Sequence, residues 1–233
     1  MDVGFFLNER IKFIRQFYET ASTPYVERKQ KIKAEEEPFV PLYSENGEPP
    51  FLEEWIEADE SLHVLAYSCV SMLAAALHLY FETWVKQSGC PIEESLKKTV
   101  FKKRGWFSGY KAHFSQRYAI QFNAAPVKHG LIEEVVLARN RIEHPTSITN
   151  QRTQYADSDI KKLRHPFFVD DREATLFSEA GEGERPWLSP PTLHVTDEQL
   201  LEAISEVERF FQWFEVEIEN QVYAHRRPTS GLT

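Results

Sequence analysis

The stretch from 137 to 145, LARNRIEHP, places together three residue types that can act on a phosphodiester. Arg139 is followed at once by Asn140, and His144 comes four residues after the asparagine. Cleavage of RNA needs a base for the 2′-hydroxyl proton, a cation for the charge on the phosphate, and an acid for the leaving 5′-oxygen. Histidine titrates in the range of such a base or acid, and a guanidinium binds phosphate oxygens through paired donors. These residues form a candidate catalytic site.

Helical geometry relates the three side chains. Asn140 and His144 are four residues apart on one face, so the amide can contact and orient the imidazole. Pro145 disfavours helical backbone at His144, so we expect the histidine at the end of a helix and exposed. The negative end of the helix dipole favours the imidazolium, whereas the neighbouring arginine opposes it. The same spacing also permits an ordinary helix end, with Arg139 paired to Glu143 and His144 as a plain C-terminal cap.

The six residues RNRIEH resemble the R-x4-6-H signature of the HEPN superfamily, in which a polar residue, often asparagine, follows the arginine. In that superfamily the motif closes a helix of a small all-α bundle. The resemblance covers residues 55 to 220 in helix order, and only the motif itself is specific. It implies a metal-independent endoribonuclease without a cofactor, acting as a symmetric homodimer whose two motifs face one cleft. His144 would be the general base or acid, Arg139 the phosphate contact and Asn140 the orienting residue.

The resemblance also implies a biological role and a second functional hypothesis. The role would be that of a toxin or defence effector that is restrained by an antitoxin or regulatory protein. Some HEPN toxins carry a modifiable tyrosine two positions after the histidine, but Thr146 stands there in this chain. Other members have lost activity and serve as RNA-binding or assembly modules. An inactive RNA- or protein-binding module is therefore the second hypothesis, and a small-molecule-binding helical bundle is the third.

The charge is distributed unevenly along the chain. The formal net charge is −9, yet no aspartate or glutamate occurs from Ser95 to Ile132. This segment carries eight lysines and arginines, which predicts a local basic surface in an acidic protein. Within it we expect Lys102, Lys103 and Arg104 to form an RNA-binding rim. Most of the interleaved rings are expected in the core; they are Phe101, Trp106, Phe107, Tyr110, Phe114 and Tyr118.

Apolar periodicity predicts the elements that position these residues. We expect helices from about residue 2 to Thr23, over 52–87, within 110–122, over 127–143, and from a capping box at Thr196 to about 222. Residues 24–50 should be a surface connector, 145–195 an irregular insertion with a small β-hairpin, and 223–233 a flexible tail. The predicted fold is all-α: an up-and-down bundle of four to five helices over 51–222, preceded by the N-terminal helix and connector of 1–50.

Several functional classes have no support in the sequence. It contains no GxGxxG, GxxxxGK[ST], HExxH or GxSxG element, and no metal-ligand spacing. Residues 61–81 carry no formal charge, a length close to a membrane span. They include two histidines and three serines and have acidic flanks, so we expect a helix central in the bundle or shared with a partner subunit. With no secretory signal pattern at the N-terminus, the expected location is the cytoplasm.

Overall fold

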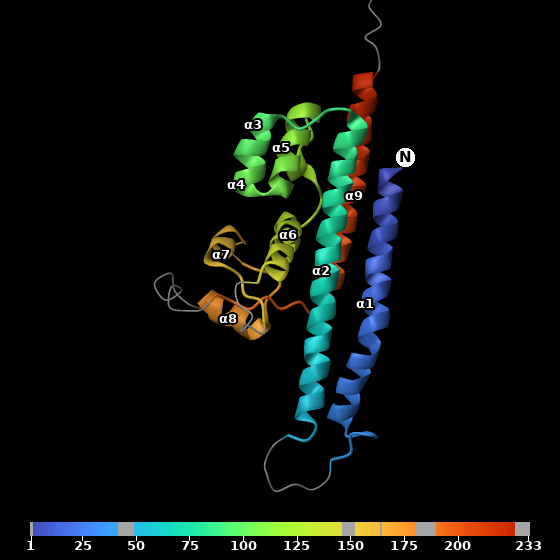
Figure 1. The fold of residues 1–233 in the computed structure, drawn as a ribbon, viewed down its shortest axis with the longest axis vertical. Coiled ribbons are helices and arrows are strands. Elements are labelled where there is room, and N and C mark those ends of the chain that lie inside the picture. The colour runs from blue at the N-terminus through green and yellow to red at the C-terminus, as the bar shows by residue number, and fades with distance from the viewer. Residues whose placement is uncertain (1, 42–48, 146–151, 164, 180–189, 227–233) are drawn as a thin grey trace, which may run out of the picture.

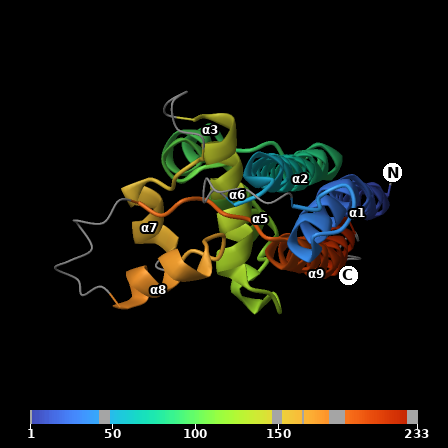
Figure 2. The same cartoon turned by 90° about the horizontal axis from the view of Figure 1, so that it is seen from below.

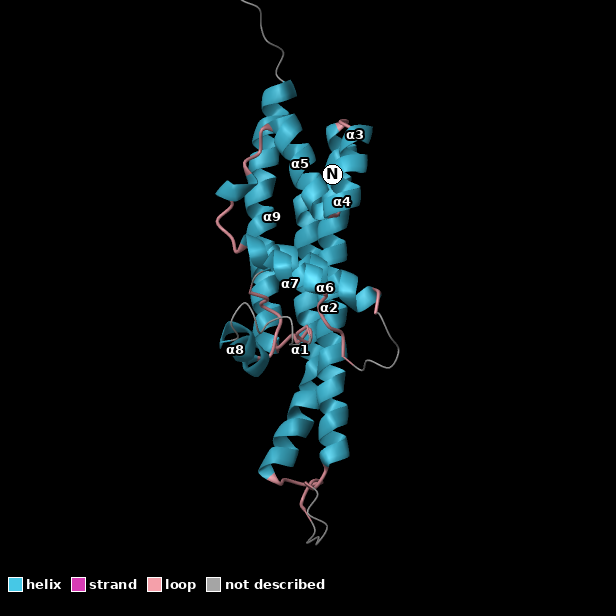
Figure 3. Ribbon diagram, turned by 90° about the vertical axis from the view of Figure 1, so that its left-hand side faces the viewer, coloured by secondary structure: helices cyan, strands magenta, loops and turns pink. Residues whose placement is uncertain are grey.

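A computed structural model describes residues 2–41, 49–145, 152–163, 165–179 and 190–226. Throughout these residues the regular secondary structure is helical, which confirms the predicted all-α class (Figure 3). Three long helices run alongside one another: α1 (Val3–Ala34), α2 (Leu52–Ser88) and α9 (Asp197–Arg226) (Figure 1). The other helices pack on the opposite side of α2 from α1, as the view along the bundle shows (Figure 2).

The smaller helices form the second half of the molecule. The segment between α2 and α5 (Trp106–Tyr118) consists of α3 (Glu94–Leu96), a π-helical turn η1 (Lys97–Phe101) and α4 (Lys102–Arg104). A 3-10 turn, η2 (Phe122–Ala124), leads to α6 (His129–Glu143). Rings from α2, α5 and α9 join these parts into one core; its fully buried aromatic residues include Phe81, Phe114, Phe210 and Phe214.

The expected ends of α2 and start of α9 are confirmed. Gly89 follows α2 with φ +67°, a conformation that favours glycine, and its N–H donates to the carbonyl of Lys86. At α9 the Thr196 N–H donates to Gln199 Oε1 at 3.0 Å, and the Gln199 N–H donates to Thr196 Oγ1 at 3.2 Å. This is the reciprocal pair of a capping box.

The predicted end of the first helix at Pro24 is wrong, because α1 continues to Ala34. A proline inside a helix removes one backbone hydrogen bond and costs about 3 kcal/mol. Tertiary contacts offset this cost beyond the proline. Lys29 pairs with Asp59 at 2.6 Å and lies 4.7 Å from the Trp55 ring centroid, while Arg28 pairs with Glu57 at 2.9 Å. Residues 24–34, assigned to the connector by the sequence, are therefore helix.

The expected β-hairpin of the insertion is also wrong for the residues described. They contain two short helices, α7 (Asp157–Leu163) and α8 (Asp171–Glu179), and one isolated antiparallel bridge between Gln154 and Thr192. Residues 174–177, ATLF, lie within α8. The backbone N–H groups of Phe167 and Phe168 donate to the carboxylate of Glu134 on α6, at 2.8 Å, so a side chain satisfies donors that a second strand would otherwise take. The tail prediction is wrong for 223–226, which continue α9, and 227–233 lie outside the described residues.

Of the described helices, α2 is the one that by length and composition alone could cross a membrane. Half of its most apolar window is buried inside the protein. A buried core helix passes the same test, and α2 packs against α1, α6 and α9.

Candidate active site at the end of helix α6

The candidate site lies where α6 leaves the core. The helix is anchored by an apolar face, of which Leu131, Ile132, Val135, Val136 and Ala138 are buried. It ends at Glu143, and His144 has φ −128° and ψ 65°, outside the helical region. The His144 N–H still donates to the carbonyl of Asn140 at 3.2 Å. The side chain of His144 is exposed, as Pro145 predicts.

Arg139 is engaged with its own helix. Its Nη1 donates to Asn140 Oδ1 at 3.1 Å, and its Nη2 forms an ion pair with Glu143 Oε2. About a third of each side chain of this ion pair is exposed. The Asn140 amide oxygen is thus directed to the guanidinium, and no hydrogen bond joins it to the imidazole of His144 within the described structure. A phosphate that binds Arg139 has to compete with Glu143.

His78, on α2, is close enough to Arg139 for the charge of the guanidinium to act on its imidazole. Its ring is 4.8 Å from Trp106 and 5.6 Å from Tyr110, centroid to centroid. Burial lowers the pKa of His78, Glu82 raises it, and the positive charge of Arg139 lowers it. The structure therefore places a second titratable imidazole within electrostatic range of Arg139. No spacing in the sequence connects the two, because they come from different helices.

The basic rim reaches the same region through Trp106. Lys102, Lys103 and Arg104 form α4 and are exposed, and Gly105 separates them from Trp106, whose ring contacts His78. Four of the interleaved rings are buried as expected: Phe107, Tyr110, Phe114 and Tyr118. Phe101 and Trp106 are partly buried against the core.

The insertion is tied to α6 at two places, one before the candidate site and one within it. The buried carboxylate of Glu134 accepts hydrogen bonds from the Tyr155 hydroxyl at 2.5 Å and from the backbone of Phe167 and Phe168. Burial raises the pKa of Glu134, and these hydrogen bonds lower it. Two residues beyond Arg139, Arg141 pairs with the buried Asp159 of α7 at 2.6 Å. These contacts hold the insertion beside the last turns of α6.

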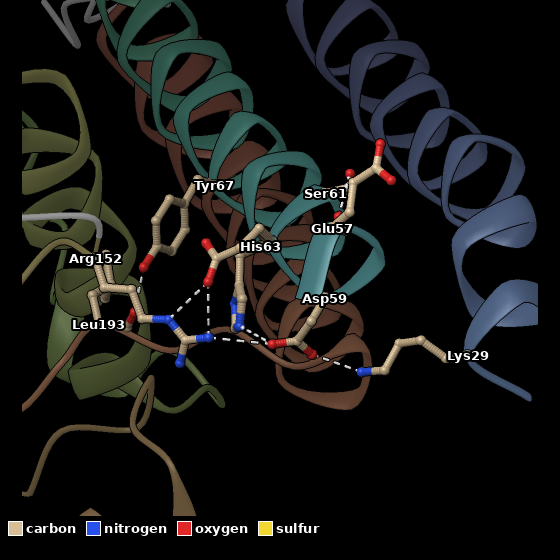
Figure 4. A network of polar contacts seen from close by, with 9 residues as sticks. Lys29, Glu57, Asp59, Ser61, His63, Tyr67, Arg152 and Leu193 are labelled. Atoms are coloured by element: carbon tan, nitrogen blue, oxygen red, sulfur yellow. Dashed lines mark hydrogen bonds and ion pairs between the residues drawn. The ribbon is translucent and has the colours of Figure 1, made fainter. Parts of the chain in front are cut away.

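A second polar network joins the insertion to α1 and α2 (Figure 4). Asp59 accepts hydrogen bonds from Lys29 at 2.6 Å and from Arg152 at 3.2 Å, and Glu60 accepts from Arg152 at 3.0 Å. His63 Nε2 lies 3.4 Å from Asp59 Oδ2, within ion-pair distance, but the geometry makes no hydrogen bond. Among the residues that the structure describes, no three His, Cys, Asp or Glu side chains are arranged to hold a metal ion. We interpret this network as structural.

Fold and site together define an all-α protein with an Arg-Asn-x3-His group at a helix end, in which the histidine is exposed and the arginine and asparagine are partly buried. Comparison of the chain with protein families, with curated proteins and with solved structures gives no match in any of the three. The geometry of the site and the motif are therefore the features of the chain that bear on its function.

Proposed function

We propose that the chain is a metal-independent endoribonuclease of the HEPN type. The observation that carries this proposal is the position of His144: its imidazole is exposed directly beyond the end of α6, one turn after Arg139 and Asn140. An exposed imidazole can exchange protons with a bound substrate, and the neighbouring guanidinium can bind phosphate oxygens.

In the proposed reaction, His144 accepts the proton of the ribose 2′-hydroxyl. The 2′-oxygen attacks phosphorus, the bond from phosphorus to the 5′-oxygen breaks, and the leaving oxygen receives a proton. The products are a 2′,3′-cyclic phosphate and a 5′-hydroxyl. Arg139 exchanges Glu143 for the phosphate oxygens and stabilises the charge that develops on them. Lys102, Lys103 and Arg104 bind phosphates farther along the strand.

The proposed oligomeric state and biological role follow from the HEPN resemblance. Two copies of the motif face one cleft in a homodimer, so that the second His144 supplies the acid. The enzyme acts in the cytoplasm as a toxin or defence effector under the control of a regulatory protein.

A specific observation favours the second candidate, an inactive RNA- or protein-binding module. Arg139 is already satisfied by Glu143 and Asn140, and the imidazole of His144 forms no hydrogen bond to a described residue. These contacts are those of an ordinary helix end. In that case the basic rim and the insertion would carry the binding.

The deciding experiment is cleavage of labelled RNA in excess EDTA, with identification of the product ends. Wild-type protein is compared with His144→Ala and with His165→Ala, which removes another exposed histidine outside the 139–144 motif. Cyclic-phosphate ends are expected from wild type and His165→Ala, and none from His144→Ala. If wild type leaves a broad panel of RNAs intact, the nuclease is excluded and the binding module stands. Equal cleavage by all three proteins would point to a co-purified nuclease.

A further inference from the structure

One face of α2 is left uncovered by the described chain. Val64 is 62% exposed and Leu79 is 45% exposed, and the small residues Ser68 and Ala75 are exposed between them. These four positions are separated by four, seven and four residues, so they lie along one side of the helix. We refer to them as the α2 seam. No charged residue occurs from 61 to 81, so the seam is uninterrupted by charge.

Two serines on this side of α2, Ser61 and Ser68, do not oppose burial. Ser68 Oγ donates to the carbonyl of Val64 at 2.8 Å, and Ser61 Oγ donates to the carbonyl of Glu57 at 2.8 Å. Each hydroxyl therefore has an acceptor inside its own helix, and covering it leaves no unpaired donor. Ser68 and Ala75 then act as small residues that let a second helix approach closely.

The α2 seam is self-complementary about the midpoint between Ser71 and Met72. Val64 and Leu79 are equally far from this point, and so are Ser68 and Ala75. Two residues of opposite charge follow the same symmetry. Glu57 and Lys86 are equally far from the midpoint, and their side chains are 69% and 72% exposed.

Only an antiparallel copy uses this symmetry. It sets Val64 against Leu79, Ser68 against Ala75 and Glu57 against Lys86, and each pair occurs twice. A parallel copy would set each residue against itself, with Glu57 facing Glu57. A surface whose residues pair reciprocally in this way is what a two-fold interface between identical subunits requires.

We propose that two copies of this chain associate through the α2 seam as an antiparallel pair of α2 helices. The proposal is argued from the surface of α2 alone, and it locates the interface of the homodimer that the proposed function includes. The pairs from Val64 to Leu79 extend over about 22 Å, and Glu57 and Lys86 lie beyond them in positions to form ion pairs between subunits. Within one chain they already contact Arg28 and Glu82, so each intersubunit pair extends an existing charge cluster.

The two-fold axis of an antiparallel pair runs across the helices, so the two α1 helices lie on the same side of the pair. Because α6 lies on the other side of α2 from α1 (Figures 1 and 2), the two α6 helices also share one side. The proposed register thus places both copies of the 139–144 group on one face of the dimer.

The first test is the mass of the protein in solution by sedimentation equilibrium. Wild type is expected to be a dimer at micromolar concentration, and Ala75→Arg is expected to weaken dimerisation at least about 100-fold, because an arginine cannot fit opposite Ser68. Ala174→Arg, at an exposed alanine of α8, is the matched control and should remain dimeric. His144→Ala should also remain dimeric, so loss of cleavage and loss of the interface are separate results. A monomeric wild type, or a dimer that Ala75→Arg leaves unchanged, would overturn the proposal.

Disulfide cross-linking tests the register. In a Cys90→Ser background, with Cys69 buried, the double variant Ser68→Cys/Ala75→Cys should form a cross-linked dimer under mild oxidation. The two introduced thiols of one chain are about 10 Å apart along the helix, too far for a bond within the chain. Ser68→Cys alone should stay uncross-linked, because its partner position is Ala75; cross-linking of this single variant would indicate a parallel pair and refute the register. Flotation of monomeric protein with lipid vesicles would instead assign the seam to a membrane surface.

Discussion

Arg139 and Glu143 form an ion pair across the last turn of α6, and the same guanidinium donates a hydrogen bond to Asn140 at 3.1 Å. The carboxylate thus occupies donors that a phosphate would use. A partly exposed pair four residues apart on a helix stabilises the protein by only about 0.3 to 0.5 kcal/mol, whereas a bidentate contact between arginine and phosphate is stronger. Exchange of Glu143 for a phosphate is therefore inexpensive.

Removal of the Glu143 charge should strengthen RNA binding. We expect Glu143→Gln to lower the dissociation constant about two- to fivefold, which corresponds to about 0.5 to 1 kcal/mol. Fluorescence anisotropy with a short single-stranded RNA measures the change. Glu133→Gln is the matched control, since Glu133 is on the same helix but pairs with Lys111 at 2.6 Å. Equal tightening by both variants would show a general charge effect and would contradict competition at Arg139.

The carboxylate of Glu134 should be the main anchor of the insertion. Glu134→Ala leaves the donors of Tyr155, Phe167 and Phe168 without their acceptor, and we expect the free energy of unfolding to fall by about 3 kcal/mol or more. Glu134→Gln keeps one acceptor oxygen, so its free energy of unfolding should lie between those of the wild type and Glu134→Ala. Urea denaturation measures stability, and limited proteolysis reports cleavage within 152–195. The exposed neighbour is the control: Glu133→Ala should change stability by less than about 1 kcal/mol. Similar losses for both alanine variants would refute the anchoring role.

Local patterns predicted those parts of the fold that depend on neighbouring residues. The apolar spacing of α2, Gly89 at its end and the capping box at Thr196 each act within one or two turns. The length of the first helix could not be predicted from local patterns. Its continuation past Pro24 depends on Lys29 and Arg28 meeting acidic residues of α2, which no local pattern contains.

In the candidate site, too, the sequence predicted the features that neighbouring residues determine and missed those that depend on tertiary contacts. Pro145 sufficed to place His144 at an exposed helix end. The partner of the Asn140 amide was not predictable, because both Arg139 and His144 were within its reach on the helix. The proximity of His78 and the role of Glu134 depend on helices and loops distant in sequence meeting in space. The hydrophobic pattern of α2 did predict a helix apolar on most sides, and the exposed α2 seam is the part that the described chain leaves uncovered.

A pair of glycines offers a test of close packing. A β-carbon at Gly109 on α5 would overlap the ring of Phe101, whereas a β-carbon at Gly130 on α6 would meet nothing within 4 Å. Gly109→Ala should therefore destabilise the protein by about 1 to 3 kcal/mol, and Gly130→Ala should stabilise it by up to about 1 kcal/mol, because alanine favours the helix. Thermal or urea denaturation compares the two. A neutral or stabilising Gly109→Ala would show that Phe101 moves aside and that the contact is not tight.

Buried histidines should make the protein less stable in mild acid. Burial lowers the pKa of His63 and of His113 from 6.5. At His113 the charge of Arg117 lowers it further, and Glu93 raises it. As the pH falls through 6.5, the unfolded chain takes up protons that the folded protein does not, so the free energy of unfolding decreases until the folded pKa is passed.

The contribution of one histidine can be isolated by comparing pH slopes. Each such group can contribute up to about 1.4 kcal/mol per pH unit, so His113→Gln should reduce the loss of stability between about pH 7.5 and pH 5.5. Burial raises the pKa of Glu134 and Glu215, so these carboxyls gain protons in the folded state as the pH falls toward 4.5 and act in the opposite direction. They are present in both proteins and cancel in the comparison. His165→Gln, at an exposed position, should retain the wild-type slope. If His113→Gln also retains it, the buried imidazole is protonated in the folded protein, and the assigned direction of its pKa is wrong.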